Sequence, residues 1–192
     1  MKYTFTLTDL ARPKEDGKTA REKIVLESRT GESARHIALK ILAYVLFKDA
    51  AGGLPLRIEQ GVGQRHKPDL VAVEKETGAV RLWIDCGQIE TKRLGRIAAQ
   101  NTRARIVVVK ATVGEARSYA RAAARFLPTD PERRVLVSFL GFGEDFLANF
   151  LAELRGANEF AYIAETSDLN VTLNGAALFT TLDRFIVEQH DR

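Results

Sequence analysis

Two aspartates stand at the open end of a predicted hairpin in the middle of the sequence. Asp69 begins the strand-like segment 69–75, and Asp85 lies near the end of the segment 79–86. Residues 76–78 (ETG) join the two segments and are typical of a tight hairpin turn. In antiparallel pairing these two strand ends lie side by side, so the two carboxylates are expected to be neighbours.

Such a pair of acids suits a divalent cation. Mg²⁺ and Mn²⁺ prefer hard oxygen ligands, and Mg²⁺ usually takes only a few carboxylates. Glu32 can supply a third carboxylate from the polar stripe of an adjoining predicted helix, and the main-chain carbonyl of Cys86 can add another oxygen. His36 shares the stripe with Glu32 and is a candidate general base.

Each acid also has an explanation that involves no chemistry. Asp69 follows Pro68 and could cap a loop. Glu32, expected in a first helical turn, favours the positive end of the helix dipole. Asp85 interrupts a strongly apolar run, and a salt bridge to a nearby arginine is the alternative reading for it.

The sequence alternates between segments with the two-residue period of strands and segments with the 3.6-residue period of helices. Residues 2–9 alternate apolar and polar side chains and are expected to pair with 22–29, across a loop at 10–20. Residues 159–187 form short alternating pieces, with a hairpin turn at Asn174-Gly175. The remaining strands are predicted at 56–60, 69–75, 79–86, 105–110 and 134–140, and helices at 31–48, 89–102, 114–126 and 143–155.

Bulk properties narrow the class of protein. The 192 residues are enough for a single domain over 1–192, and the net charge of +4 is compatible with a nucleic-acid partner without requiring one. The single cysteine excludes a disulfide within the chain and favours the cytoplasm. No apolar run reaches membrane-spanning length and no secretory signal is evident, so no membrane association is expected.

Two short motifs carry a resemblance to known proteins. Pro68-Asp69, followed by Ile84-Asp85, resembles the core motif of the PD-(D/E)XK nuclease superfamily. Nearly the whole chain, more specifically, resembles the YaeQ family of bacterial proteins. The pieces that carry this likeness are Glu32-Ser33 through Arg35, LAY at 42–44, the Gly61 loop, LWIDCGQ at 82–88 and Lys92-Arg93.

The resemblance implies a fold and an activity. The fold class is α/β (α+β), with a restriction-endonuclease-like core in which helices flank a four-stranded mixed sheet. Additional β-strands are expected at the N- and C-termini. The implied activity is Mg²⁺- or Mn²⁺-dependent hydrolysis of phosphodiester bonds in nucleic acid, with Glu32, Asp69, Asp85 and Cys86 as metal ligands.

One position departs from the superfamily pattern. The motif lysine belongs two residues after the second acid, where this chain has Gly87. If the strand continued, residues 85 and 87 would face the same side, so the absent side chain is the one expected in the site. Gln88, turned inward by a bulge, or Lys92, in the first turn of the next helix, are the candidate replacements.

The glycine leaves two functions open. In the first, Glu32, Asp69 and Asp85 bind metal while Gln88 or Lys92 positions water or phosphate. In the second, the chain is a nuclease fold that does not cut and acts as a nucleic-acid- or protein-binding module.

Overall fold

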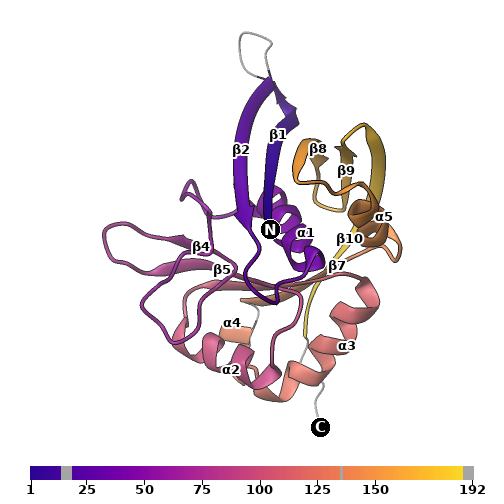
Figure 1. Cartoon of the computed structure of the whole chain (residues 1–192). Helices are drawn as coiled ribbons and strands as arrows, with labels where there is room; N and C mark the ends of the chain where they lie inside the picture. Colours follow the sequence, from indigo (N-terminus) through magenta and orange to yellow (C-terminus); the bar gives the residue numbers. More distant parts are fainter. Residues whose placement is uncertain (14–18, 135, 188–192) are drawn as a thin grey trace. The chain divides into compact units, whose positions relative to one another are not determined.

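The chain forms two compact units. The computed structural model describes residues 1–13, 19–134 and 136–187 (Figure 1). Unit 1 comprises Met1–Ala38 and Phe142–Leu182, and unit 2 comprises Leu39–Gly141 and Asp183–Arg192. Three elements, α1, β7 and β10, contribute residues to both units. The expectation of a single domain over 1–192 stays a prediction.

Unit 1 is built on strands from both ends of the chain. Their order is β2-β1-β8-β9-β10, with a parallel β1/β8 pair and antiparallel β1/β2, β8/β9 and β9/β10 pairs. The strands are β1 (Lys2–Pro13), β2 (Thr19–Glu27), β8 (Ala157–Ala164), β9 (Asp168–Leu173) and β10 (Ala176–Ile186), and the unit also contains α5 (Phe146–Glu153).

The alternation near the N-terminus has the expected consequence. Tyr3, Phe5 and Leu7 are buried, and Phe5 pairs with Ile24 in the predicted hairpin partner. The loop expected at 10–20 is wrong at both ends, because β1 continues to Pro13 and β2 begins at Thr19. Residues 14–18 lie outside the described part of the chain. These strands supply the extra terminal β structure that was predicted.

The predicted Asn174-Gly175 turn is confirmed. It joins β9 to β10, with φ of 51° at Asn174 and 95° at Gly175. Two successive positive φ angles match the right-handed twist of a hairpin, and asparagine and glycine tolerate them best.

Unit 2 holds a mixed sheet with helices packed on it. The strand order is β7-β6-β5-β4-β3. The β7/β6 and β6/β5 pairs are parallel, and the β5/β4 and β4/β3 pairs are antiparallel. The mixed α+β class is therefore confirmed. The strands are β3 (Arg57–Ile58), β4 (Leu70–Val73), β5 (Val80–Cys86), β6 (Arg105–Lys110) and β7 (Val137–Phe142).

Two helices cover one face of these strands (Figure 1). They are α2 (Thr91–Gln100) and α3 (Val113–Ala123). The 3-10 turn η1 (Ala124–Phe126) follows α3 directly. A further short helix, α4 (Pro131–Arg134), is not predicted by the sequence pattern. The small and aliphatic residues of α2 and α3 pack against alternate side chains of the sheet. This core includes Leu94, Ile97, Ala120 and Ala123 from the helices and Trp83, Ile106, Val108 and Phe139 from the strands.

The long apolar helix begins later than predicted. α1 runs from Ala34 to Phe47, whereas 31–48 was expected. Ser33 sets the start, because its Oγ accepts a hydrogen bond of 3.3 Å from the main-chain N–H of His36, in the geometry of an N-cap. Glu32 therefore precedes the helix and does not lie in its first turn.

The polar stripe of α1 is not uniformly exposed. Lys40 is only 1% exposed, and its ammonium forms an ion pair with Glu59. Glu59 has a φ of 53°, which ends β3 after two residues, although a strand over 56–60 was predicted. No helix in the described ranges is long and apolar enough to cross a membrane.

Candidate functional site

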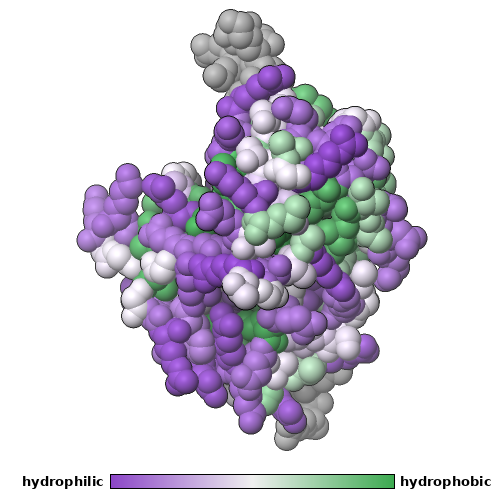
Figure 2. Space-filling model, viewed as in Figure 1, coloured by the Kyte–Doolittle hydropathy of each residue, from purple (hydrophilic) through white to green (hydrophobic). Residues whose placement is uncertain are grey.

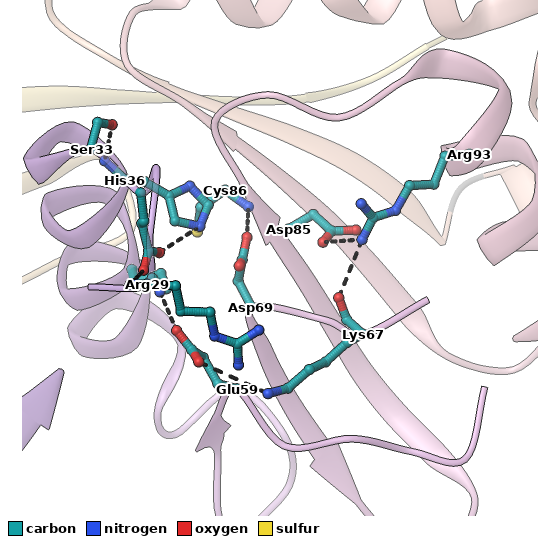
Figure 3. A network of polar contacts seen from close by, with 11 residues as sticks. Arg29, Ser33, His36, Glu59, Lys67, Asp69, Asp85, Cys86 and Arg93 are labelled. Carbon is teal, nitrogen blue, oxygen red and sulfur yellow. Dashed lines mark hydrogen bonds and ion pairs between the residues drawn. The ribbon is translucent and has the colours of Figure 1, made fainter. Parts of the chain in front are cut away.

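Asp85 is a buried carboxylate with one hydrogen-bond donor and one ion-pair partner. It is 4% exposed and shares with Trp83 the face of β5 that packs against α2 and α3. Trp83 Nε1 donates a 2.8 Å hydrogen bond to Oδ2. Arg93 Nη2 lies 3.8 Å from Oδ1 (Figure 3). Arg93 also donates to the carbonyl of Lys67. The arginine partner expected as the alternative role for Asp85 is thus present.

Asp69 lies on the neighbouring chain segment, just before β4. Leu70 pairs with Ile84, so Asp69 and Asp85 flank the same end of the β4/β5 ladder. Asp69 Oδ2 accepts a 2.7 Å hydrogen bond from the main-chain N–H of Cys86 (Figure 3). This bond satisfies an N–H at the strand end and fixes the orientation of the Asp69 carboxylate.

Gly87 does not continue the strand. β5 ends at Cys86, and Gly87 has a φ of 69°, in the left-handed region that glycine adopts most easily. The alternation that would put residues 85 and 87 on one face therefore stops before residue 87. A lysine at this position would be strained, which is a physical reason for the departure from the motif.

A lysine from the next strand occupies this region. Lys110, the last residue of β6, is 5% exposed, and its ammonium donates a hydrogen bond to the Gly87 carbonyl. Asp85 pairs with Val108, and Lys110 follows two residues later on the same face of the sheet. The structure therefore brings Lys110 to the face that carries Asp85.

Tyr119 of α3 completes this cluster. Lys110 Nζ lies 3.8 Å from the centroid of the Tyr119 ring, a cation–π contact. Burial raises the pKa of the Tyr119 phenol, and the negative charge of Asp85 raises it further, against the opposing effect of Arg93. The phenol therefore stays protonated and remains a hydrogen-bond donor across the physiological range.

Neither predicted replacement for the motif lysine lies in this cluster. Gln88 is exposed, and no bulge turns its side chain inward. Lys92 occupies the first turn of α2 and is also exposed. Both side chains face solvent, whereas Lys110 is buried.

Cys86 is fully buried, next to both acids. Burial raises the pKa of its thiol well above the ordinary value, and the charges of Asp69 and Asp85 raise it further, against Lys40 and Lys110. Without a metal the group is therefore a thiol at neutral pH. The expected contribution of Cys86 to a metal site, through its main-chain carbonyl, stays a prediction.

Glu32 and His36 form a local pair in unit 1. Glu32 Oε1 lies 3.4 Å from His36 Nε2, and Glu32 Oε2 accepts a 3.0 Å hydrogen bond from the N–H of Arg29. Asp69 and Asp85 belong to unit 2. These contacts give Glu32 a defined structural role before α1.

The fit of a cation can be judged from the donor set. In the described ranges, no three or more His, Cys, Asp and Glu side chains are grouped so that they could hold a metal ion. Mg²⁺ often binds proteins through only one or two carboxylates, with water and substrate phosphate as further ligands. Asp69 and Asp85, at adjacent strand ends, have the chemistry for that type of site.

Basic side chains surround the loop before β4 and the start of α2. The pKa of His66 is lowered by partial burial and then by the charges of Arg93, Arg65 and Arg96. The surface over α2 is mostly hydrophilic in Figure 2. Arg65, His66, Arg93 and Arg96, with the exposed Lys67, define what we call the basic surface of unit 2.

The sequence did contain signals for the residues that pattern reasoning missed. Lys110 ends an otherwise apolar β-branched run, and polar groups at the carboxyl ends of buried parallel strands commonly line sites. Tyr119 stands next to Ala120 on a helix whose alanines pack on the sheet. A tyrosine beside such residues is expected to place its hydroxyl in the core or at the edge of the core.

Comparisons with known proteins agree on one family. The family model described as YaeQ protein matches residues 1–138. The crystal structure of YaeQ protein from Xanthomonas axonopodis pv. citri has 18% sequence identity and a TM-score of 0.71, covering 96% of each chain. That from Pseudomonas syringae has 17% identity and a TM-score of 0.71, covering 98% of this chain and 97% of its own. No curated protein matches. This chain belongs to the YaeQ family.

Proposed function

We propose that this protein is a metal-dependent nuclease in which Lys110 takes the part of the missing motif lysine. The observation that carries the proposal is the position of Lys110, which is buried, bonded to the Gly87 carbonyl and on the same sheet face as Asp85. In this reading, unit 2 is a restriction-endonuclease-like core. Its mixed β4–β7 sheet with packed helices supports that reading.

The acids would hold the cation. A bound Mg²⁺ or Mn²⁺ would supply an activated water and would offset the charge that develops on the phosphate. Asp69 and Asp85 would contribute carboxylate oxygens from adjacent strand ends. The Cys86 N–H bond to Asp69 and the Trp83 bond to Asp85 keep both groups oriented.

Lys110 would act on the phosphate or on the attacking water. Its ammonium is a donor with no acceptor function, held by the Gly87 carbonyl and the Tyr119 ring. A buried cation at this point can orient a water or a phosphoryl oxygen without a large reorganisation. The basic surface of unit 2 would guide the phosphate backbone towards it.

The test is a cleavage panel with single- and double-stranded DNA and RNA, each with Mg²⁺ or Mn²⁺. Wild type should cleave at least one substrate, and Asp85→Asn and Lys110→Met should lose that activity. Arg81→Gln is a suitable control, because Arg81 is exposed and pairs with Glu74 at the other end of β5. Equal cleavage by wild type and Asp85→Asn would contradict the proposal.

A second candidate is a nuclease-like protein that binds without cutting. The observation that favours it is the engagement of both Asp85 oxygens, one by Trp83 and one by Arg93. It predicts nucleic-acid binding that weakens steeply with salt but shows no metal-dependent cleavage. Cleavage that requires both Mg²⁺ and Asp69 would exclude this candidate.

A further inference from the structure

Two buried donors near Asp85 have no acceptor. The Tyr119 hydroxyl and Arg93 Nε are shielded from solvent and have no hydrogen-bond partner among the described residues. Leaving such donors unpaired is unfavourable, and proteins normally satisfy them with another group, an ordered water or a ligand. Arg93 pairs with Asp85, and the charges of both residues act on the Tyr119 phenol, so the two donors belong to one region and indicate a position for an oxygen acceptor there.

The position of Tyr119 follows from the strand register. Asp85 pairs with Val108, and Val108 pairs with Phe139, which places these three residues in one row across the sheet. The Tyr119 ring packs on Phe139, with 6.1 Å between centroids, and also lies against the ammonium of Lys110. The ring therefore lies against the row that contains Asp85, and these two contacts hold the ring in place.

The surroundings favour an anionic acceptor. Arg93 lies 3.8 Å from one oxygen of Asp85, and Lys110 supplies a second cation on the same face. These two positive charges offset the charges of Asp85 and of Asp69 at the adjacent strand end, and one of the two unpaired donors belongs to the charged guanidinium of Arg93. A phosphoryl oxygen, which is anionic and accepts several hydrogen bonds, matches such donors better than a neutral water does.

We propose that Tyr119 Oη and Arg93 Nε form a subsite for a phosphoryl oxygen beside Asp85. The subsite deepens the proposed function. It rests on that function for the identity of the ligand, because the phosphate is taken to be that of the substrate, bound next to the carboxylate assigned to the metal. An ordered structural water is the competing occupant.

Inorganic phosphate is the probe for this subsite. The full chain is titrated at constant ionic strength, without metal or nucleic acid, while the fluorescence of Trp83 is recorded. Trp83 is the single tryptophan of the sequence and donates directly to Asp85, so it reports on this site alone. We expect a saturable change in wild type and about tenfold weaker binding in Tyr119→Phe, which deletes one donor to a charged acceptor.

Two matched controls accompany this variant. Tyr162→Phe removes a hydroxyl that donates to Asp9 in unit 1, and it should leave the phosphate affinity unchanged. Arg96→Gln removes an exposed charge from the same helix as Arg93 and tests for a general electrostatic effect. Arg93→Gln should weaken binding by more than Arg96→Gln does.

Stability measurements separate the two occupants. Without phosphate, Tyr119→Phe should unfold at the same urea concentration as wild type or at a higher one, because the lost hydroxyl has no partner. A destabilised Tyr119→Phe would mean that a structural water already satisfies the hydroxyl, and this would overturn the subsite. Equal phosphate affinity in Tyr119→Phe and wild type would overturn it as well.

The outcome is independent of cleavage. Phosphate binding that depends on Tyr119, in a protein that cuts no nucleic acid, would support the subsite and contradict the nuclease. Cleavage that depends on Asp85, without Tyr119-dependent phosphate binding, would support the nuclease and overturn the subsite.

Discussion

Lys110 donates a hydrogen bond from its ammonium group to the main-chain carbonyl of Gly87, the residue at the motif-lysine position. The contact joins the ends of two parallel strands, β5 and β6. Under the proposed function, Lys110 reaches from the adjacent strand the place that the PD-(D/E)XK motif would give to a lysine at residue 87.

Lys110→Met tests this assignment. The substitution keeps most of the length of the side chain and removes the charge, so kcat/KM for metal-dependent cleavage should fall about 100-fold or more. Lys92→Met and Gln88→Ala, at exposed positions, should change it by less than about threefold. If only Lys92→Met lost cleavage activity, Lys92 and not Lys110 would take the part of the motif lysine.

Gly87→Ala should destabilise the protein. Its φ of 69° is unfavourable for any residue with a Cβ atom, at a cost of about 1–2 kcal/mol. Urea denaturation followed by circular dichroism measures the loss. Gly61→Ala is the control, since Gly61 has no positive φ and open space around it. Gly87→Lys, which restores the motif, should be at least as unstable as Gly87→Ala.

Because the pKa of the buried Cys86 thiol is raised, we expect the protein to lose stability at alkaline pH. The folded state holds the thiol proton at pH values where the unfolded chain has lost it. This contribution is complete below the ordinary thiol pKa of about 8.5 and is lost progressively as the pH rises towards the folded pKa. The free energy of unfolding should therefore fall more steeply above pH 8.5 in wild type than in Cys86→Ala. Identical pH profiles would contradict the shift.

The pKa of His66 should depend on the charges of the basic surface of unit 2. The arginines beside it lower its pKa, so screening them with salt should raise that pKa towards about 6.5, leaving only the part that is due to burial. Arg93→Gln should raise it more than Arg65→Gln, in the order of their effects. Titration of the His66 ring protons by NMR provides the measurement. Arg81→Gln, on β5, should have no effect.

Local patterns in the sequence predicted the elements with strong periodicity. The β-branched run 105–110 is β6 with the predicted limits, and the Asn174-Gly175 turn joins β9 to β10. Boundaries shifted where a single residue ends an element: Ser33 delays α1, and the positive φ of Glu59 shortens β3. These events depend on one side chain or one backbone angle, which periodicity does not register.

The candidate site was only half predictable for a different reason. Asp69 and Asp85 are joined by a hairpin, whose register follows from its own turn. Lys110 reaches Gly87 through the parallel pairing of β5 and β6, two strands that are connected through α2, which packs on one face of the sheet. A parallel crossover leaves no local mark of its register in the sequence, so Gln88 and Lys92, close in the chain, were the natural choices.

The inaccessibility of Cys86 also makes the chain convenient for site-directed labelling. Its single thiol is buried and protonated at neutral pH, so maleimide reagents should react with an introduced surface cysteine and leave the native one intact. One surface cysteine in each unit, for example at Lys23 and Arg103, would then carry a pair of spin labels in an otherwise natural sequence. The distribution of distances between the two labels, recorded with and without nucleic acid, would test whether nucleic acid changes the separation of the two labelled positions.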